Sequence, residues 1–358
     1  MTTRDWSKAE WVDPAHDWKP LEVAELPERV LIDYITKCNL RCPMCPVWGS
    51  DDDNEIDQVK GAISEENSRR LLDEIMAAKP MVAPAVYGEP LLVPNLKKVF
   101  TDIKSRGMPL SMNTNGLTLT DDIAQFMVDI KVDSVMFSID SVTRETLKKV
   151  RGIHALEKIE SAVFRLMKIR GDAEFPRVGV SFTIQKENEH ELEAFVQRWV
   201  GVVDVVRTCP MFDSDVGSFE NVNAEGERLP CPAIYKTMPV HNDGTVRLCC
   251  LDGFRATDMG NVFKDGVKAV WHGEEFAKAR YYHETGQWDK VPFCKPCNGW
   301  AQYEYEEEVK DGIMIRRSPQ FTYYNTIRRL ANWSGTLLGG HKPPPEELVG
   351  KATEESVG

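Results

Sequence analysis

The strongest constraint on the fold of this 358-residue chain is a regular alternation of short apolar runs and amphipathic segments. Buried strands are expected at residues 30–36, 81–88, 109–113, 132–139, 178–184 and 202–207. Helices are expected between them at residues 64–79, 95–106, 121–129, 154–170 and 189–199. Short connections and right-handed crossovers turn such a series into a parallel sheet. The predicted fold class is therefore α/β, a partial (β/α)6 TIM-like barrel with its functional loops at the C-terminal ends of the strands.

Composition narrows the class of protein. Hydrophobic residues make up 42% of the chain and charged residues 28%, which suits a globular protein with an ample core. A net charge of −12 argues against nucleic acid as the main partner, because phosphate binding needs a basic face. We find no run of membrane-spanning length, and residues 1–18 lack the apolar core of a signal peptide. We therefore expect a cytoplasmic location, where clustered cysteines more often hold metal than form disulfides.

Three of the nine cysteines crowd into the stretch CNLRCPMC, directly after the first expected strand. A structural zinc site would need a fourth ligand, which this loop lacks, and three free core cysteines fit poorly with its polar residues and prolines. The spacing C-x3-C-x2-C of Cys38, Cys42 and Cys45 resembles the signature of the radical S-adenosylmethionine (SAM) superfamily. The resemblance covers most of the chain. It implies that three thiolates bind three irons of a [4Fe–4S] cluster, while the fourth iron stays open to SAM.

The stretch YGEPLL ends the second expected strand and resembles a Gly-Gly-Glu-Pro-like motif of the same family. Tyr87 stands in place of the first glycine, while Gly88 and Glu89 remain. In the family this segment holds the amino group of SAM, through its backbone and its acidic side chain. The alternative is a plain turn with a solvated glutamate.

The resemblance also assigns SAM contacts at the ends of later strands and in the cysteine loop. The remaining residues of this set are Met44, Asn113, Asn115, Ser138, Asp140 and Arg151. Ser138 and Asp140 resemble the ribose-binding position, and Arg151 resembles an arginine that meets the SAM carboxylate, although it could be a solvated residue at a helix end. Met44 occupies a position where relatives usually carry an aromatic residue against adenine, so a stacking contact is weakened.

A second set of cysteines lies in the C-terminal half. Cys231 is followed by Cys249 in GTVRLC and, after a long gap, by Cys294 and Cys297 in CKPC. The C-x2-C pair alone could be a zinc knuckle. The whole order resembles the SPASM/Twitch extension of radical SAM enzymes, without the further cysteines that follow in full SPASM domains. It implies one auxiliary [4Fe–4S] cluster with these four ligands, and hence two clusters and SAM as cofactors.

Two cysteines remain as candidate catalytic thiols. Cys209 follows the sixth expected strand, at the rim of the barrel, where a thiol could return a hydrogen atom to a substrate radical. A packed cysteine beneath the second domain is the plain alternative. Cys250 adjoins Cys249, and neighbours on a strand point to opposite faces, which favours a buried structural thiol.

These assignments divide the chain into four parts. We expect an N-terminal extension (1–28), the radical SAM barrel (29–207), a Twitch/SPASM-like domain (208–300) and a C-terminal helical extension ending in a tail of disordered composition (301–358). Residues 301–333 are predicted to form a helix over the barrel mouth or a dimer contact, so a homodimer is one option.

The resemblance implies the chemistry as well. A flavodoxin- or ferredoxin-type donor would reduce the first cluster, and SAM would be cleaved to a 5′-deoxyadenosyl radical that removes a hydrogen atom from the substrate. The predicted substrate is a small polar, sugar- or cyclitol-like molecule, which would be oxidised or epimerised. The alternative is radical modification of a ribosomally made peptide. A third hypothesis is a non-enzymatic electron-transfer protein. The three-cysteine site and the SAM-like motifs argue against it.

Overall fold

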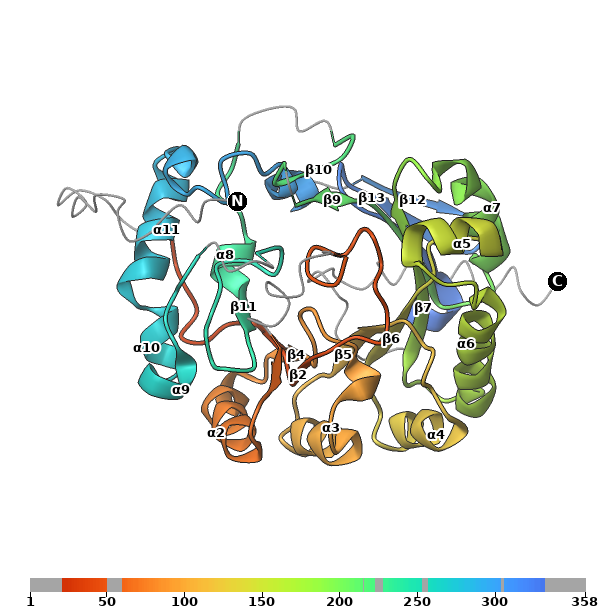
Figure 1. The fold of residues 1–358 in the computed structure, drawn as a ribbon, viewed down its shortest axis with the longest axis horizontal. Helices are drawn as coiled ribbons and strands as arrows, with labels where there is room; N and C mark the ends of the chain where they lie inside the picture. Colours follow the sequence, from red (N-terminus) through yellow and green to blue (C-terminus); the bar gives the residue numbers. More distant parts are fainter. Residues whose placement is uncertain are drawn as a thin grey trace.

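A curved sheet wrapped by helices forms the frame of the molecule (Figure 1). The computed structural model describes residues 21–49, 60–214, 216–222, 228–252, 257–303 and 306–331. The expectations for most of the N-terminal extension, residues 1–20, and for the tail, residues 332–358, lie outside these ranges.

The parallel part of the sheet agrees with the predicted barrel. Its strands are β1 (Arg29–Ile32), β4 (Met81–Ala83), β5 (Ser111–Thr114), β6 (Ser134–Ser138), β7 (Arg177–Ile184) and β8 (Val205–Pro210). Strand β1 pairs with β4, the strands from β5 to β8 pair in order, and a bridge between Val82 and Leu110 joins the two groups. The short strand β2 (Ile35–Thr36) continues β1 and pairs with β3 (Gly61–Ala62). Each predicted strand position holds a strand, and the partial barrel is confirmed.

Helices lie around this sheet, most of them on its outer side (Figure 1). They are α2 (Glu65–Ile75), α3 (Leu96–Ser105), α4 (Asp121–Asp129), α5 (Arg144–Arg151), α6 (Leu156–Arg170) and α7 (Leu192–Trp199), with short 3-10 turns η2 (Met76–Ala78), η3 (Pro90–Leu92) and η4 (Glu189–Glu191). Ser64 caps α2 as predicted, because its hydroxyl accepts a hydrogen bond from the amide of Asn67. Helix α5 was not predicted, since its sequence RETLKKVR is mostly charged. Among the described helices, none is both long and apolar enough to cross a membrane.

The second half of the chain is built onto the same sheet. Strand β11 (Thr237–Val240) pairs in parallel with β1 along its full length. This half also contains the hairpin of β9 (Phe212–Asp213) and β10 (Ser218–Phe219), the helices α8 (Ala233–Lys236), α9 (Val262–Asp265), α10 (Val267–Trp271) and α11 (Glu274–Glu284), and the turns η5 (Trp288–Lys290) and η6 (Gly299–Tyr303). Strand β11 therefore extends the parallel sheet of the barrel, although it comes much later in the sequence. It anchors the second cysteine set to the barrel.

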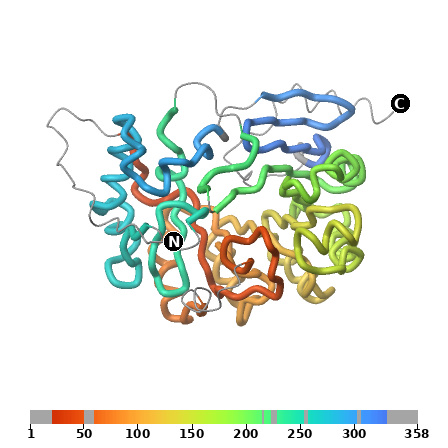
Figure 2. The backbone as a smooth tube through the Cα atoms, turned by 45° about the horizontal axis from the view of Figure 1, so that its top comes forward, coloured from red at the N-terminus to blue at the C-terminus, as the bar shows by residue number. Residues whose placement is uncertain are grey.

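The helix predicted over residues 301–333 is wrong for most of its length. Residues 306–326 form the strands β12 (Glu306–Lys310), β13 (Ile313–Arg317) and β14 (Thr322–Thr326), and only α12 (Ile327–Ala331) is helical. The three strands form an antiparallel meander on the free edge of β8, visible in blue in Figure 2. Pairing with β8 satisfies the backbone groups of an edge that would otherwise be open.

Candidate active site

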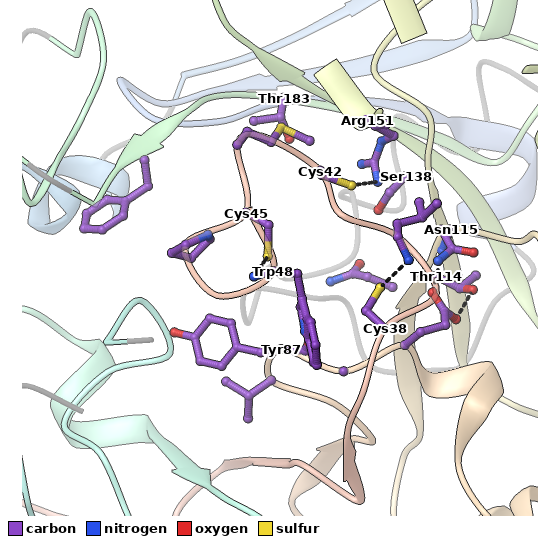
Figure 3. Close-up of a pocket in the computed structure, with 18 of the residues that line it drawn as sticks. Cys38, Cys42, Cys45, Trp48, Tyr87, Thr114, Asn115, Ser138, Arg151 and Thr183 are labelled. Carbon is purple, nitrogen blue, oxygen red and sulfur yellow. Dashed lines mark hydrogen bonds between the residues drawn. The ribbon is translucent and has the colours of Figure 1, made fainter. Parts of the chain in front are cut away.

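The first cysteine loop follows β2 and lies at the mouth of the barrel (Figure 3). The amide of Leu40 donates to Cys38 Sγ at 3.4 Å, and the amide of Trp48 donates to Cys45 Sγ at 3.3 Å. Donors of this kind stabilise the thiolate form that binds iron. The loop closes tightly around Gly49, where an added Cβ would lie 2.5 Å from the carbonyl oxygen of Cys42.

The three thiols of this loop face a shared cavity. Burial raises the pKa of Cys38 to about 11 and also raises the pKa of Cys42, so metal binding must displace their protons. Within the described ranges, no three or more Cys, His, Asp or Glu side chains converge on a single metal ion. Thiolates of an iron–sulfur cluster bind different irons and need not converge, so the arrangement fits a cluster.

The cavity has a volume of about 390 Å³ and is lined by the three cysteines and most of the expected SAM contacts. Those contacts are Met44, Gly88, Glu89, Asn113, Asn115, Ser138 and Arg151. Of the SAM contacts assigned from the sequence, Asp140 is the one that does not line it. The structure thus brings together residues from the first cysteine loop, from the segment that follows β4, from the C-terminal ends of β5 and β6, and from α5.

Gly88 and Glu89 are held closely between neighbouring strand ends. An alanine Cβ at position 88 would lie 1.9 Å from the carbonyl oxygen of Ile35, so only glycine fits. The Glu89 carboxylate is 3% exposed and accepts hydrogen bonds from Thr114 Oγ1 at 2.5 Å and from the amide of Asn115 at 2.9 Å. Burial raises the pKa of Glu89. Its side chain is therefore fixed before any ligand binds.

Asp140 does not line the cavity but forms an ion pair with Arg151, which does. Its carboxylate is fully buried, forms a 2.5 Å ion pair with the Arg151 guanidinium and accepts a hydrogen bond from the amide of Thr183 at 2.7 Å. The same guanidinium lies 4.0 Å from Cys42 Sγ. Met44 is also oriented, because Gln185 Nε2 donates to its sulfur at 3.0 Å.

The four cysteines of the second set gather in one place. Burial, and after it the neighbouring Cys297, raises the pKa of Cys231 to about 12. A hydrogen bond with Cys250, burial and the neighbouring Cys231 raise the pKa of Cys249. Burial, followed by Cys231, raises the pKa of Cys294. These mutual effects place the thiols near one another, and four cysteines are the donor set that one auxiliary cluster needs.

Comparison with known families agrees with both sites. The model of the radical SAM superfamily matches residues 32–198, and that of an iron–sulfur cluster-binding domain, SPASM, matches residues 221–298. The chain belongs to the radical SAM superfamily. It carries a C-terminal SPASM domain, and its cofactors are [4Fe–4S] clusters and SAM.

Curated relatives differ in what they are named for. A tungsten-containing aldehyde ferredoxin oxidoreductase cofactor-modifying protein of Pyrococcus furiosus is 28% identical over 264 residues, which are 70% of this chain and 71% of the relative. A probable GTP 3′,8-cyclase of Saccharolobus islandicus is 28% identical over 173 residues, 47% of this chain and 51% of the relative. The aligned part of this chain thus spans only about half the length of the GTP 3′,8-cyclase.

Solved structures show the same fold at low identity. BtrN in complex with AdoMet and 2-DOIA has a TM-score of 0.50 and 16% identity, covering 75% of this chain and 92% of its own. The structure of anSMEcpe with bound AdoMet (SAM) has a TM-score of 0.54 and 15% identity. The match covers 75% of this chain and 85% of anSMEcpe. SuiB of Streptococcus suis, bound to the precursor peptide SuiA, has a TM-score of 0.51 and 13% identity, covering 71% and 66%. At such identities the likeness concerns the fold alone.

The two candidate thiols occupy different places in this radical SAM protein. Cys250 lines the cavity together with Leu251, whereas the sequence favoured a buried structural thiol. Residues 249 and 250 lie in a turn rather than a strand, so strand alternation does not apply to them. Cys209 lies on β8 in register with Thr183 but is not among the residues that line the cavity. Burial raises its pKa.

Sequence reasoning missed several residues of this candidate site. Asp33 is fully buried, and its carboxylate accepts hydrogen bonds from the amides of Val86, Tyr87 and Gly88 at 2.8, 3.1 and 3.4 Å. A carboxylate inside the apolar run VLIDYIT was the available signal. The cavity is also lined by Trp48, Val86, Tyr87, Thr183, Met211, Phe212 and Leu251. Most of these are apolar or aromatic, and such residues are indistinguishable from core residues in a sequence.

Proposed function

We propose that this radical SAM enzyme removes a hydrogen atom from a small, sugar- or cyclitol-like substrate in the cavity and that the substrate is then oxidised. The observation that carries this proposal is the shared cavity wall. Cys250 and Leu251 line the same space as Cys38, Cys42 and Cys45, and the adjacent Cys249 belongs to the second cysteine set. An electron acceptor would therefore stand beside the substrate.

The chain's own residues would bind and orient the reactants. When bound, the first cluster and SAM supply a 5′-deoxyadenosyl radical that removes a hydrogen atom, and the second cluster supplies an acceptor for one electron. Loss of that hydrogen atom, one electron and one proton turns a secondary alcohol into a ketone. Glu89 would bind the ammonium group of SAM, and Arg151, oriented by Asp140, would bind its carboxylate. Phe212 and Leu251 would exclude water.

The cavity can hold a compact substrate beside the cofactors. It measures about 390 Å³, and the first cluster and SAM would occupy part of that volume. A panel of sugars, cyclitols and short peptides, incubated anaerobically with reduced holoenzyme and SAM, tests the substrate class. We expect a sugar or cyclitol to raise 5′-deoxyadenosine above the substrate-free level and to lose two hydrogens. Stimulation by peptides alone would favour the peptide-modifying alternative.

Epimerisation is a second candidate, and the position of Cys250 favours it. A thiol in the cavity wall could return a hydrogen atom to the opposite face of the substrate radical. Because thiol hydrogens exchange with water, a product formed in heavy water would then carry one deuterium at the reacting carbon. Oxidation to a ketone places no solvent hydrogen there.

The two outcomes are separated by one isotope experiment with two variants. For oxidation we expect no deuterium at the reacting carbon and continued turnover in Cys250→Ala. Deuterium incorporation, together with loss of turnover in Cys250→Ala, would overturn oxidation in favour of epimerisation. Cys209→Ala is the matched control, because Cys209 does not line the cavity.

A further inference from the structure

Tyr87 lies between the two cysteine sets, at the position where the family motif carries a glycine. Its ring lines the cavity, beside Trp48 in the close-up view (Figure 3). Its hydroxyl donates a hydrogen bond to the carbonyl oxygen of Cys250. Glycine has no side chain that could make this contact, so the departure from the motif creates a link that the usual residue cannot provide.

The backbone of Tyr87 is fixed to the barrel and to the first cysteine loop. Its amide donates to Asp33 Oδ1 at 3.1 Å, and its carbonyl accepts a hydrogen bond from Trp48 Nε1 at 2.8 Å. The amide of Trp48 in turn donates to Cys45 Sγ. A continuous series of hydrogen bonds therefore runs from Cys45 through Trp48 and Tyr87 to Cys250.

The side chain of Tyr87 has little freedom to leave this place. Its ring stacks on His241 with centroids 6.2 Å apart and an angle of 13° between the planes. His241 is 1% exposed and follows β11 directly. Burial raises the pKa of Tyr87 well above its usual range, so the phenol keeps its proton and remains a donor.

We propose that Tyr87 is a positioning residue that sets the separation between the first cysteine loop and the Cys249–Cys250 segment. This role rests on the proposed function, because it takes Cys249 as a ligand of the second cluster. Without the phenol hydroxyl, the Cys250 carbonyl loses a donor, and the adjacent Cys249 can move relative to the cavity. The environment of the second cluster would change, while the three ligands of the first cluster would stay in place.

The test is Tyr87→Phe, which keeps the ring and its stacking and removes only the hydroxyl. The reconstituted holoenzyme is reduced and examined by electron paramagnetic resonance with and without SAM. We expect an iron content equal to that of the wild type, an unchanged response of the first cluster to SAM, and an altered midpoint potential of the second cluster. The spin–spin broadening between the two reduced clusters should also change, because it reports their separation.

Tyr235→Phe is the matched control. Its hydroxyl donates to Glu284 Oε1 at 2.7 Å, so it loses a phenol hydrogen bond close to the second cysteine set but away from the first loop. A second cluster with wild-type potential and broadening in Tyr87→Phe would overturn the proposal, as would an equal change in Tyr235→Phe. A wild-type iron content near four rather than eight would instead overturn the proposed function, and this role with it.

Discussion

The roles of individual residues in the site depend on close packing that no sequence motif reveals. Cys38, Cys42 and Cys45 are predicted as cluster ligands because their spacing resembles the family signature. The partners of Asp33 could not be predicted, because they are three amides that lie more than fifty residues further along the chain. Asp140 was placed at the ribose by resemblance, whereas the structure buries it against Arg151. Which residue touches a ligand and which one holds its neighbour is decided by three-dimensional packing.

The glycine at position 88 gives a direct test of this packing. In Gly88→Ala the new Cβ would collide with the Ile35 carbonyl oxygen, at 1.9 Å, and would displace the loop that carries Glu89. We expect a loss of about 1–3 kcal/mol in the free energy of unfolding and weaker SAM binding, measured by denaturation and titration. Gly171→Ala is the control, because that glycine has φ +54° and nothing within 4 Å, so it suffers backbone strain alone. Equal SAM affinity in the two variants would contradict this prediction.

Removal of the Asp33 carboxylate should affect the same loop. Asp33→Ala leaves the amides of Val86, Tyr87 and Gly88 without their acceptor, and we expect about 1–3 kcal/mol of destabilisation together with weaker SAM binding. Asp33→Asn retains one acceptor oxygen and should lose less stability and less SAM affinity than Asp33→Ala. Thermal unfolding and SAM titration measure the two effects. SAM affinity that is unchanged in Asp33→Ala would show that the amides do not depend on this carboxylate.

At the scale of elements, the predictable part of the fold was the part with strong periodicity. The six parallel strands and their main helices follow directly from apolar runs and amphipathic segments. The meander of β12, β13 and β14 was missed because its aromatic and basic residues suggested a helix, and because pairing with β8 is a long-range interaction. Strand β11 could not be predicted as a partner of β1 for the same reason, since about two hundred residues separate them.

The meander offers a stability test at this scale. Asn325 on β14 is 4% exposed; its Nδ2 donates to the Met314 carbonyl at 3.1 Å, and its Oδ1 accepts from Arg177 at 2.5 Å. We expect Asn325→Ala to lower the free energy of unfolding by about 1–3 kcal/mol, because Arg177 and the Met314 carbonyl each lose one buried hydrogen bond. Val309→Ala on the exposed strand β12 should change it by less than about 0.5 kcal/mol. Similar denaturation midpoints for both variants would argue against a packed meander.

At the scale of the whole molecule, one cavity joins the two halves of the chain. Both cysteine sets are predicted from the sequence, because their order and spacing resemble motifs of the radical SAM family. The placement of Cys250 and Leu251 in the wall of the cavity beside the first cysteine set could not be predicted, because it depends on β11 docking beside β1. This placement is what turns two separate cysteine motifs into a single candidate active site.

The two cysteine sets should be separable by mutation. In Cys294→Ala/Cys297→Ala the second cluster loses two ligands, so we expect the iron content after anaerobic reconstitution to fall from about eight to about four. SAM cleavage should persist and substrate turnover should be lost. The melting temperature should also fall, since metal ligation contributes folding energy. Zinc in place of iron at this site in the wild type would contradict the auxiliary-cluster assignment.

Formation of 5′-deoxyadenosine from SAM by the reduced, reconstituted protein is the most direct test of the whole interpretation. It should be compared in the wild type, in Cys294→Ala/Cys297→Ala and in Cys38→Ala/Cys42→Ala/Cys45→Ala. We predict 5′-deoxyadenosine from the first two proteins and none from the third, because the loop beside Glu89 and Arg151 holds the cluster that cleaves SAM. Formation at the wild-type level in the third protein would contradict the assignment of this cavity as a radical SAM active site.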